Sequence, residues 1–423
     1  MSKQEIIQKT LRFFAKKILK RYKPRIIGIT GSVGKSTTKE MIFAVLKDEF
    51  NTRKSEKNYN NEVGIPLTII GASGEKKNVL QWIVVFIQAI KIAFLPSNYP
   101  EVLVLELAAD QIGDIKYFCD FIPIEVGILT NVGISHLENF KTKENIFKEK
   151  SYLLKQASEC VIYNKDNIDE EKIQKIITVN SKSYGFNGSV DFNISEIGYN
   201  YSGANVLAGT IFKVSYGKGT ISGKLNNLMG RPYLYGVLAV VAVADYFKID
   251  LKNAIASLEN KAVIPGHMAL IKGIKNTSII DDTYNSAPAS VREALDVVKE
   301  IDSDRKIIVL GDMLELGERE ESSHKIIGKK VAEIEGSIFI AVGNRMKVAV
   351  DRFKKNVSDS QSRVYWFENS IEAGRAVQNL MRQGDLILIK GSQGMRMEKI
   401  VVEIMAEPNR KKELIVRQDK DWI

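Results

Sequence analysis

The residues best suited to chemistry lie between positions 25 and 41, in the run RIIGITGSVGKSTTKEM. A glycine turn followed at once by lysine and serine is typical of a phosphate-binding loop, in which backbone N–H groups hold phosphate oxygens. In such a loop Lys35 contacts the β- and γ-phosphates, and the Ser36 hydroxyl binds Mg²⁺. The general pattern G-x-x-x-x-G-K-S/T requires glycine at position 29, where this chain has Ile29, so a plain structural turn is the alternative. The predicted nucleotide-binding residues of this run are Thr30, Gly31, Ser32, Val33, Gly34, Lys35, Ser36 and Thr37.

A second polar run, NYNNEVGIPLTI at residues 58–69, combines asparagines with a glycine and a proline. Asparagine amides both donate and accept hydrogen bonds, which suits the amide and carboxylate groups of a peptide. Taken alone, the run is more simply explained as a capped turn. A peptide-binding role for Asn60 and Asn61 is the alternative.

Further polar residues follow predicted strands. Glu106 ends the run EVLVLEL, and a carboxylate at the carboxyl end of a buried parallel strand lies where α/β proteins bind ligands. It could complete a Mg²⁺ shell with Ser36, or it could be an ordinary surface residue. His136 follows another strand, in TNVGISHLENF, although a lone histidine is more often structural. Lys150 lies 14 residues later in a helical segment.

The elements that must position these residues alternate between strands and helices. RIIGIT predicts a short apolar strand and KSTTKEMIFAVLKDEF has helical spacing, so the loop has the strand-turn-helix context that a phosphate site requires. EVLVLEL and VGILTNV are rich in Val, Ile and Leu, which is typical of buried strands in a parallel sheet. RPYLYGVLAVVAVADYF predicts an apolar helix.

A second α/β unit follows along the chain. SIIDDTY, KIIVLGD, SIFIAVG and DLILIKG predict strands that alternate with helical segments such as SVREALDVVKEI. ENKAVIPGH predicts a connection, which places a boundary near Ile264. We therefore predict an α/β protein with a basic amphipathic helix at residues 1–24, a P-loop domain with a parallel sheet at 25–264, and a Rossmann-like α/β domain at 265–423.

Composition and charge limit the class of protein. A chain of 423 residues that is 44% hydrophobic and 26% charged can form two or three folded domains. Cys119 and Cys160 form neither a disulfide framework nor a zinc-binding pattern, which fits a reducing cytoplasm. The net charge of +10 fits nucleic acid, an anionic membrane or an anionic substrate. No nucleic-acid-binding motif is present, and we expect no nucleic-acid partner.

Two segments raise the question of a membrane contact. Residues 3–23 predict a basic amphipathic helix, and they do not resemble a signal peptide. Its apolar stripe consists of Ile7, Leu11, Phe14 and Ile18. A surface helix packed on the next domain is the simpler explanation, and a helix lying on an anionic membrane is the alternative. Residues 79–95 are short and interrupted for a membrane span, so they predict a buried or interfacial helix.

Six motifs occur in the order found in the Mur ligases, and the chain resembles that family from about Arg25 to about Val402. The motifs are GSVGKSTTKE, NYNNEVGIP, TNVGISHLENF, IIDDTYNSAP, VLGDMLELG and KGSQGMRME. Mur ligases use the shortened loop T-G-x-x-G-K-S/T, which TGSVGKS fits. The resemblance is greatest to the branch that adds a D-alanyl-D-alanine dipeptide, and it implies an amide ligase of peptidoglycan-precursor synthesis that uses ATP and Mg²⁺.

The resemblance also implies a mechanism and roles for individual residues. A substrate carboxylate would attack the γ-phosphate of ATP, and an amine would then displace phosphate from the acyl phosphate. Lys150 matches the lysine that CO₂ carbamylates in the family, which turns a cation into a carboxylate-like metal ligand. The implied catalytic residues are Lys35, His136, Lys150 and Asp282, and the implied metal ligands are Ser36, Glu106, His136 and Lys150. The implied substrate contacts are Asn60, Asn61, Asn285, Lys390 and Ser392, and the nucleotide site also includes Tyr233 and His267.

The chain departs from the family pattern at four places. We expect only a short helix before the loop, where dipeptide-adding members carry a domain that holds the uridine nucleotide. Pro232 and Tyr233 replace the histidine-asparagine pair of the adenine site, where the Tyr233 ring could stack on the base. His267 replaces an arginine and is mostly uncharged near neutral pH, and Tyr152 replaces a glutamate that follows the carbamylated lysine. These differences concern the substrate and the rate more than the fold.

The resemblance therefore predicts a ligase that joins a D-alanyl-D-alanine-like amine to a UDP-muramoyl-peptide-like acid. One alternative is a Mur-type ligase with another acid substrate, such as a poly-amino-acid or folate-like acceptor. Another is a catalytically weak, nucleotide-binding partner in a cell-wall complex. We expect a cytoplasmic monomer. A peripheral contact to the inner face of the membrane through segments 3–23 and 79–95 is a separate hypothesis.

Overall fold

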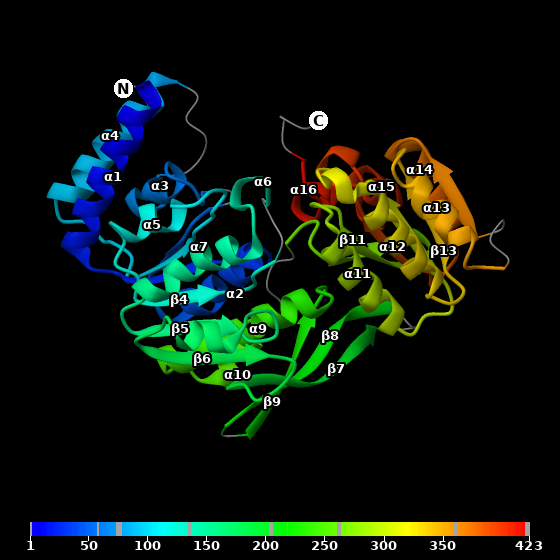
Figure 1. The fold of residues 1–423 in the computed structure, drawn as a ribbon, viewed down its shortest axis with the longest axis horizontal. Helices are drawn as coiled ribbons and strands as arrows, with labels where there is room; N and C mark the ends of the chain where they lie inside the picture. Colours follow the sequence, from blue (N-terminus) through cyan, green and yellow to red (C-terminus); the bar gives the residue numbers. More distant parts are fainter. Residues whose placement is uncertain are drawn as a thin grey trace. The chain divides into compact units, whose positions relative to one another are not determined.

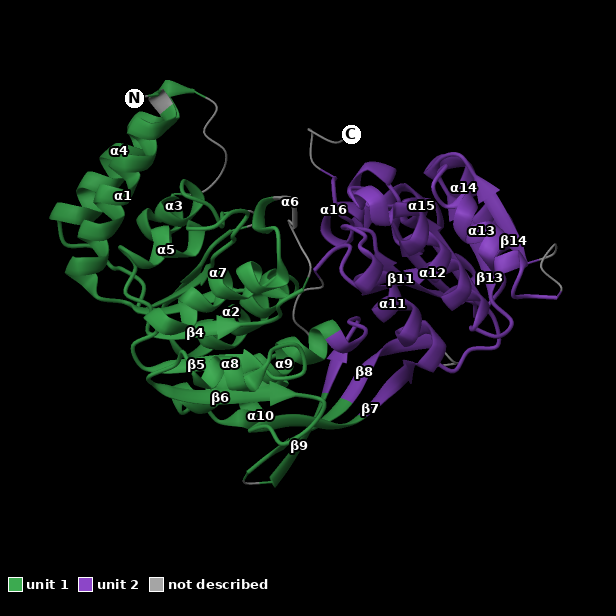
Figure 2. Cartoon of the chain, in the orientation of Figure 1, with its two compact units in different colours: residues 1–196, 212–223, 232–261 green, residues 197–211, 224–231, 262–423 purple. Residues whose placement is uncertain are grey.

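The fold contains two sheets with helices packed on them, as the sequence predicted (Figure 1). The computed structural model describes residues 2–56, 59–72, 78–133, 137–202, 206–217, 219–259, 264–358 and 363–418. Two compact units are present (Figure 2): the first comprises residues 1–196, 212–223 and 232–261, and the second 197–211, 224–231 and 262–423. The division into domains at residues 24 and 264 stays a prediction, because compact units of this kind are a different description of the chain.

The first sheet has the strand order β2-β3-β1-β4-β5-β6-β7-β8-β9, and every neighbouring pair from β2 to β7 is parallel. Its strands are β1 (Arg25–Thr30), β2 (Thr52–Lys54), β3 (Val102–Glu106), β4 (Val126–Leu129), β5 (Cys160–Asn164), β6 (Asn180–Gly185), β7 (Phe192–Ser202), β8 (Val206–Tyr216) and β9 (Gly219–Asn226). Because β1 lies between β3 and β4, the carboxyl ends of these three strands meet at one edge, where Ile29 is paired with Glu106 and Thr30 with Leu129.

Helices cover the central strands β1, β3, β4 and β5 of this sheet, which are buried along almost their whole length. The helices of this part of the chain are α1 (Lys3–Tyr22), α2 (Lys35–Glu49), α3 (Gly64–Ile70), α4 (Val79–Phe94), α5 (Asp114–Cys119), α6 (Leu137–Phe140), α7 (Lys143–Gln156), α8 (Glu170–Gln174), α9 (Arg231–Phe247) and α10 (Leu251–Ala256). Buried residues of α1, α3, α4, α5 and α7 form one hydrophobic cluster with Ile26, Leu103 and Leu129 of the strands. Helix α2 packs against β1, β2 and β3, which fixes the loop at its N-terminus.

The second unit contains a six-stranded sheet of order β10-β11-β15-β12-β13-β14, antiparallel only between β10 and β11 among the described strands. Its strands are β10 (Ala269–Gly273), β11 (Thr277–Asp282), β12 (Lys306–Gly311), β13 (Ile338–Val342), β14 (Val364–Phe367) and β15 (Leu386–Lys390). Its helices are α11 (Pro288–Glu300), α12 (Glu320–Ala332), α13 (Lys347–Lys354), α14 (Ser370–Leu380), α15 (Glu398–Ile404) and α16 (Lys411–Leu414), with short 3-10 turns η1 (Ile274–Asn276), η2 (Gly317–Arg319), η3 (Gln393–Met395) and η4 (Pro408–Arg410). Ile279 of β11 and alternate residues of β12, β13 and β15 form its core with buried residues of α14 and α15.

The two segments that raised the question of a membrane behave differently. The apolar stripe of α1 faces the core, with Leu11 and Ile18 fully buried and Ile7 and Phe14 partly buried. That stripe is therefore not available to a membrane. It packs on the next part of the chain, as the simpler explanation of residues 3–23 predicted. Helix α4 buries only Val85, Ala89 and Ala93 within the described structure. None of the helices in the described ranges combines the length and the apolar character that a transmembrane segment needs.

Candidate functional site

The loop between β1 and α2 adopts backbone conformations that favour glycine. Gly31 has a φ of 151° and Gly34 a φ of 84°. A Cβ on Gly31 would lie 2.1 Å from Oγ1 of Thr130, so the loop and the end of β4 approach too closely for a side chain. The first turn of α2 contains no acidic residue, and its partial positive charge points toward the loop. This arrangement favours an anion at the loop.

Side chains of the loop hold it against neighbouring strands. The Thr30 hydroxyl donates to a backbone carbonyl after β3 at 2.8 Å. The Ser32 hydroxyl donates to the Gly133 carbonyl at 3.1 Å and accepts from the Gly133 N–H at 3.0 Å. The Val33 side chain is exposed, whereas Thr37 is buried in α2. The loop is thus shaped by protein contacts before any ligand binds.

Ser36 and Glu106 meet at the carboxyl edge of the sheet. Oγ of Ser36 lies 3.0 Å from each carboxylate oxygen of Glu106. The Ser55 hydroxyl accepts from the Glu106 N–H at 3.0 Å, and Nζ of the buried Lys39 lies 3.3 Å from Oε2 of Glu106. Sequence reasoning missed Lys39. Its position four residues after Lys35, on the same face of α2, was the available signal.

Two lysines converge on one backbone oxygen of the loop. Nζ of Lys35 donates to the Gly31 carbonyl at 2.9 Å, and Nζ of Lys150 donates to the same carbonyl at 3.2 Å. Lys150 is 1% exposed. Burial, followed by the positive charge of Lys35, lowers the pKa of Lys150 to about 8. Burial also lowers the pKa of Lys35, while the charges of Glu106 and Asp110 act in the opposite direction.

A buried carboxylate next to Lys150 was also missed. Glu149 accepts from the Gly113 N–H at 2.8 Å and from the Ile115 N–H at 2.7 Å, which joins α7 to the start of α5. The buried Oδ1 of Asn131, beside the loop, has no hydrogen-bond partner among the described residues. His136 falls outside the described residues. Within those residues, no group of three or more His, Cys, Asp or Glu side chains is placed to hold a metal.

Asn61 forms a capped turn, in agreement with the simpler explanation of the asparagine run. Oδ1 of Asn61 accepts from the Gly64 N–H at 2.9 Å and from the Val63 N–H at 3.2 Å, which satisfies donors at the start of α3. The Asn60 carbonyl accepts from the Ala108 N–H at 3.2 Å, just after β3. The run therefore lies next to the end of β3 that carries Glu106.

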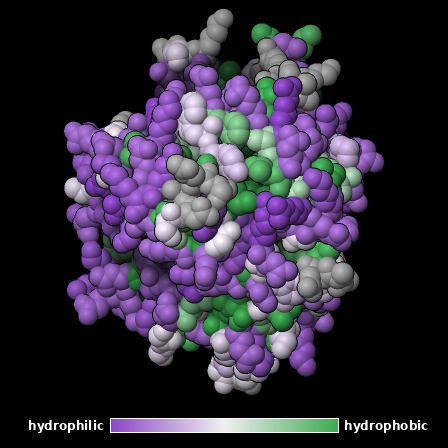
Figure 3. Space-filling model, turned by 90° about the vertical axis from the view of Figure 1, so that its right-hand side faces the viewer, coloured by the Kyte–Doolittle hydropathy of each residue, from purple (hydrophilic) through white to green (hydrophobic). Residues whose placement is uncertain are grey.

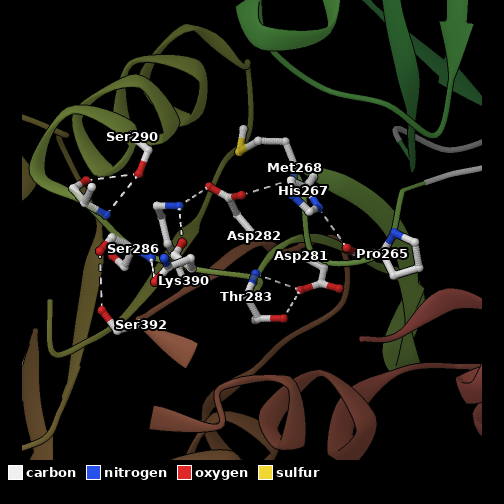
Figure 4. Close-up of polar contacts among 12 residues, drawn as sticks. Pro265, His267, Met268, Asp281, Asp282, Thr283, Ser286, Ser290, Lys390 and Ser392 are labelled. Carbon is white, nitrogen blue, oxygen red and sulfur yellow. Dashed lines mark hydrogen bonds and ion pairs between the residues drawn. The ribbon is translucent and has the colours of Figure 1, made fainter. Parts of the chain in front are cut away.

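The second unit carries a separate polar cluster at the ends of β11 and β15, drawn in Figure 4. Asp282 and Lys390 are register partners, and Nζ of Lys390 lies 2.6 Å from Oδ2 of Asp282. The same ammonium donates to the Asn285 carbonyl at 2.9 Å. Oδ1 of Asp282 accepts from the Met268 N–H at 3.3 Å. This pairing brings three predicted site residues together: Asp282, Asn285 and Lys390.

Serines extend the cluster on one side (Figure 4). The Ser392 hydroxyl accepts from the Leu314 N–H at 2.9 Å and donates to the Ser286 carbonyl at 3.3 Å. The buried Oγ of Ser286 has no hydrogen-bond partner among the described residues. Sequence reasoning did not assign Ser286 a role, although it lies inside the DDTYNSAP motif.

Asp281 and His267 lie on the other side of the cluster (Figure 4). The fully buried Asp281 accepts from the Thr283 N–H at 3.1 Å, the Thr283 hydroxyl at 2.6 Å and the Gly266 N–H at 3.1 Å. Burial raises the pKa of Asp281 to about 7. Nδ1 of His267 lies 3.0 Å from the carbonyl oxygen of Pro265, and its ring stacks on Tyr284 with centroids 4.4 Å apart.

Tyr233, the predicted adenine contact, lies in α9 of the first unit and is 2% exposed. Stacking of its ring on a base would therefore require its neighbours to move. Apart from Tyr233, and from His136, which lies outside the described residues, the structure groups the predicted residues into two sets, one around the loop and one around Asp282.

Comparison with known proteins identifies the family. Residues 29–80 and 88–244 match the family model of the Mur ligase middle domain, and residues 266–393 match the model of the Mur ligase, glutamate ligase domain. The chain is 29% identical over 414 residues to the UDP-N-acetylmuramoyl-tripeptide–D-alanyl-D-alanine ligase of Bacillus subtilis (strain 168), covering 94% of this chain and 79% of that protein. It is 28% identical to the ligase of the same name from Buchnera aphidicola subsp. Baizongia pistaciae, covering 90% of this chain and 75% of that protein.

Solved structures show the same fold. The MurF ligase from Thermotoga maritima, crystallised in complex with ADP, superposes with a TM-score of 0.76 at 23% identity and covers 96% of this chain and 84% of that chain. MurF from Acinetobacter baumannii gives a TM-score of 0.74 at 23% identity, covering 93% and 79%. The two family models together account for most of the chain, and the resemblance stated from the six motifs is confirmed. The chain belongs to the Mur ligase family of ATP-dependent ligases, which join an acid to an amino acid or peptide.

Proposed function

We propose that this chain joins D-alanyl-D-alanine, or a similar amine, to the carboxylate of a UDP-muramoyl peptide in the cytoplasm, using ATP and Mg²⁺. The observation that carries the proposal is the match of 94% of the chain to a ligase of that name from Bacillus subtilis. The motifs NYNNEVGIP and VLGDMLELG, which belong to the dipeptide-adding branch, support the same assignment.

The loop of the first unit suits the phosphates of ATP. Its glycines allow close approach of the backbone, α2 begins there, and Lys35 adds a cation. Ser36 and Glu106 place hydroxyl and carboxylate oxygens beside each other, and oxygen atoms are the ligands that Mg²⁺ prefers. The residues therefore fit the ion, which when bound would neutralise phosphate charge. We assign Ser36 and Glu106 as its ligands, and Lys39 as the residue that positions Glu106.

The reaction would proceed by two substitutions. A carboxylate oxygen of the acid attacks the γ-phosphorus of ATP, and the bond between that phosphorus and the bridging oxygen of ADP breaks. The neutral amine nitrogen then attacks the acyl carbon, the bond from that carbon to the phosphate oxygen breaks, and a proton passes from the nitrogen to the departing phosphate. The Lys35 ammonium would offset the charge that develops on the phosphoryl oxygens. We assign Asp282, Asn285, Lys390 and Ser392 to the face that binds the incoming amine.

We further propose that Lys150 is carbamylated. CO₂ reacts only with the neutral amine, and a lysine with a pKa of about 8 is neutral far more often at pH 7 than an ordinary lysine. The amine nitrogen would bond to the carbon of CO₂ and release a proton to water, and the resulting carbamate would carry oxygen atoms able to bind a metal next to the loop. Lys150→Ala should lower kcat by about 100-fold or more, and a short carboxylic acid such as acetate should restore part of it. Lys148→Ala, on the exposed side of the same helix, is the matched control. Loss of activity that no carboxylate restores would argue for a purely structural lysine.

The first test is phosphate release from ATP and Mg²⁺ with a UDP-muramoyl tripeptide, with and without D-alanyl-D-alanine, followed by mass measurement of the product. A product heavier by the dipeptide, absent with L-alanyl-L-alanine, is the expected result. Ser36→Ala should abolish it, whereas Ser322→Ala, an exposed serine of the second unit, should not. Product formed only with a folate-like or poly-amino-acid acceptor would show that the acid substrate is not a UDP-muramoyl peptide. ATP binding without any product would indicate the partner role.

A further inference from the structure

Helix α4 exposes an apolar face that the fold leaves uncovered in the described structure. Exposed apolar residues are normal on a protein surface. The side of the molecule drawn in Figure 3 is mainly hydrophilic, with smaller areas of hydrophobic residues. On α4 the exposed residues are instead contiguous, with 46–74% of each side chain exposed. They are Val79, Leu80, Ile83, Val84, Ile87 and Ile90. We call these residues the α4 face.

The spacing of these residues makes the α4 face continuous. At 100° per residue they fall within an arc of about 140°. The buried residues Val85, Ala89 and Ala93 recur every four positions on the opposite side, against the core. A surface helix normally places charged residues on its outward side, and here that side is apolar except for Lys91. A continuous apolar surface of this kind marks an interaction site.

The basic side of α1 borders the α4 face. The two helices lie side by side (Figure 1), and the Arg21 guanidinium donates to the Ala93 carbonyl at 3.1 Å. Nζ of Lys17 lies 4.0 Å from the ring centroid of Phe94, which is itself exposed at the end of α4. Residues 3–23 contain eight Lys or Arg and one acidic residue, Glu5. Lys9, Lys16, Lys17 and Lys20 are exposed.

We propose that α1 and α4 together form a docking surface for an anionic lipid bilayer. The α4 face would enter the boundary between headgroups and acyl chains, and the α1 lysines would contact anionic headgroups. Charge distinguishes this occupant from a second copy of the chain. A symmetric contact through the same surface would bring two sets of α1 lysines together, whereas anionic lipid neutralises them. The apolar contribution comes from α4, because the apolar stripe of α1 is buried in the core.

Flotation of the full chain with vesicles tests the proposal. Vesicles of 30% phosphatidylglycerol in phosphatidylcholine should carry the protein, and pure phosphatidylcholine vesicles should carry much less. Ile83→Gln with Ile87→Gln should weaken binding to anionic vesicles by at least about tenfold, because less apolar surface enters the bilayer. Lys16→Gln with Lys20→Gln should weaken it by about 25-fold at low salt, at roughly fivefold for each lysine.

Matched variants separate these effects from general changes in hydrophobicity or charge. Ile326→Gln with Ile371→Gln removes two equally exposed isoleucines of the second unit, and Lys354→Gln with Lys355→Gln removes two of its exposed lysines. Both should bind vesicles as the wild type does, and all four variants should keep the far-UV circular dichroism of the wild type. Absence of wild-type flotation, or equal loss in test and control variants, overturns the proposal. A dimer in gel filtration that Ile83→Gln with Ile87→Gln dissociates would identify a second copy as the occupant.

Discussion

At the scale of single residues, two buried oxygen atoms lack the hydrogen bonds that buried polar groups normally make within a folded protein. Oδ1 of Asn131 and Oγ of Ser286 have no hydrogen-bond partner among the described residues, although buried polar groups are nearly always paired. Each atom lies beside a proposed site, Asn131 at the loop and Ser286 at the Asp282 cluster. A bound ligand would supply the missing partner. Sequence could not show this, because an unpaired atom is recognised only when its surroundings are known.

Ser286→Ala tests this interpretation. The substitution removes a hydroxyl that makes no bond in the described structure, so the free energy of unfolding should change by less than about 0.5 kcal/mol. The KM for the incoming amine, which we assign to this cluster, should rise several-fold. Ser392→Ala is the control, because it removes the acceptor of the Leu314 N–H and should cost about 1–2 kcal/mol. Urea unfolding and steady-state kinetics measure both, and equal destabilisation by the two variants would contradict the assignment.

Titration of Asp281 should make the free energy of unfolding depend on pH between about 4 and 7. Its pKa is about 7 in the folded chain, compared with an ordinary value of 3.8, so the folded state retains a proton that the unfolded chain releases. The resulting stabilisation is complete below about pH 4 and is lost as the pH rises toward 7. The free energy of unfolding of the wild type relative to Asp281→Asn should therefore fall over this range and then level off. Urea titrations at closely spaced pH values measure it, and a difference that rises with pH would be the opposite result.

At the scale of elements, the strand, turn and helix with strong local sequence signals were predictable, whereas the burial of charged side chains was not. The strand-turn-helix around the loop follows from RIIGIT, the glycines and the helical spacing after them, and the observed β1 and α2 begin at the predicted residues, Arg25 and Lys35. The meeting of Ser36 with Glu106 follows from the rule that parallel strands end at one edge. Lys39 and Glu149 are buried only because other elements supply their partners, and no pattern within one helix records this.

Glu149 should be a major link between α7 and α5. Glu149→Ala leaves the Gly113 and Ile115 N–H groups without their carboxylate acceptor, so it should lower the free energy of unfolding by about 2–4 kcal/mol. Glu149→Gln keeps one acceptor oxygen and should cost less. Glu144→Ala provides the comparison on the same helix, because Glu144 is exposed and pairs with Lys172 at the surface, where ion pairs contribute little. Chemical denaturation measures all three, and similar values for positions 144 and 149 would show that the link is unimportant.

At the scale of the whole molecule, the sequence predicted two α/β units because runs of apolar strands alternate with helical spacing in both. Each unit has its own hydrophobic core. Strands β7, β8 and β9 were not predicted. In β7, FNISEIGYNYS mixes polar and apolar residues without strict alternation, and much of the strand is exposed, so the pattern of a half-buried strand is weak. The location of the loop and its fold were predictable, whereas the chain's path through these strands was not.

Two cores lead us to expect two calorimetric transitions. A non-hydrolysable ATP analogue with Mg²⁺, at about 100 times its Kd, should stabilise the first unit by about 2.7 kcal/mol. The transition that moves with nucleotide should be the one lowered by Glu149→Ala, and Ser392→Ala should lower the other. Differential scanning calorimetry measures these shifts. Equal movement of both transitions in every variant would show that the chain unfolds as one cooperative body.

The interleaved course of the chain affects how its gene can be divided. The polypeptide passes between the two units five times, after residues 196, 211, 223, 231 and 261. The Leu207 N–H donates to the Ser278 hydroxyl at 3.2 Å, and Leu228 forms a bridge with Ala269, so early segments support the edge of the second sheet. An expression fragment that starts at residue 265 would lack that support. For the same reason, a single recombination event between related genes could not exchange one unit whole, and the two units are expected to be inherited together.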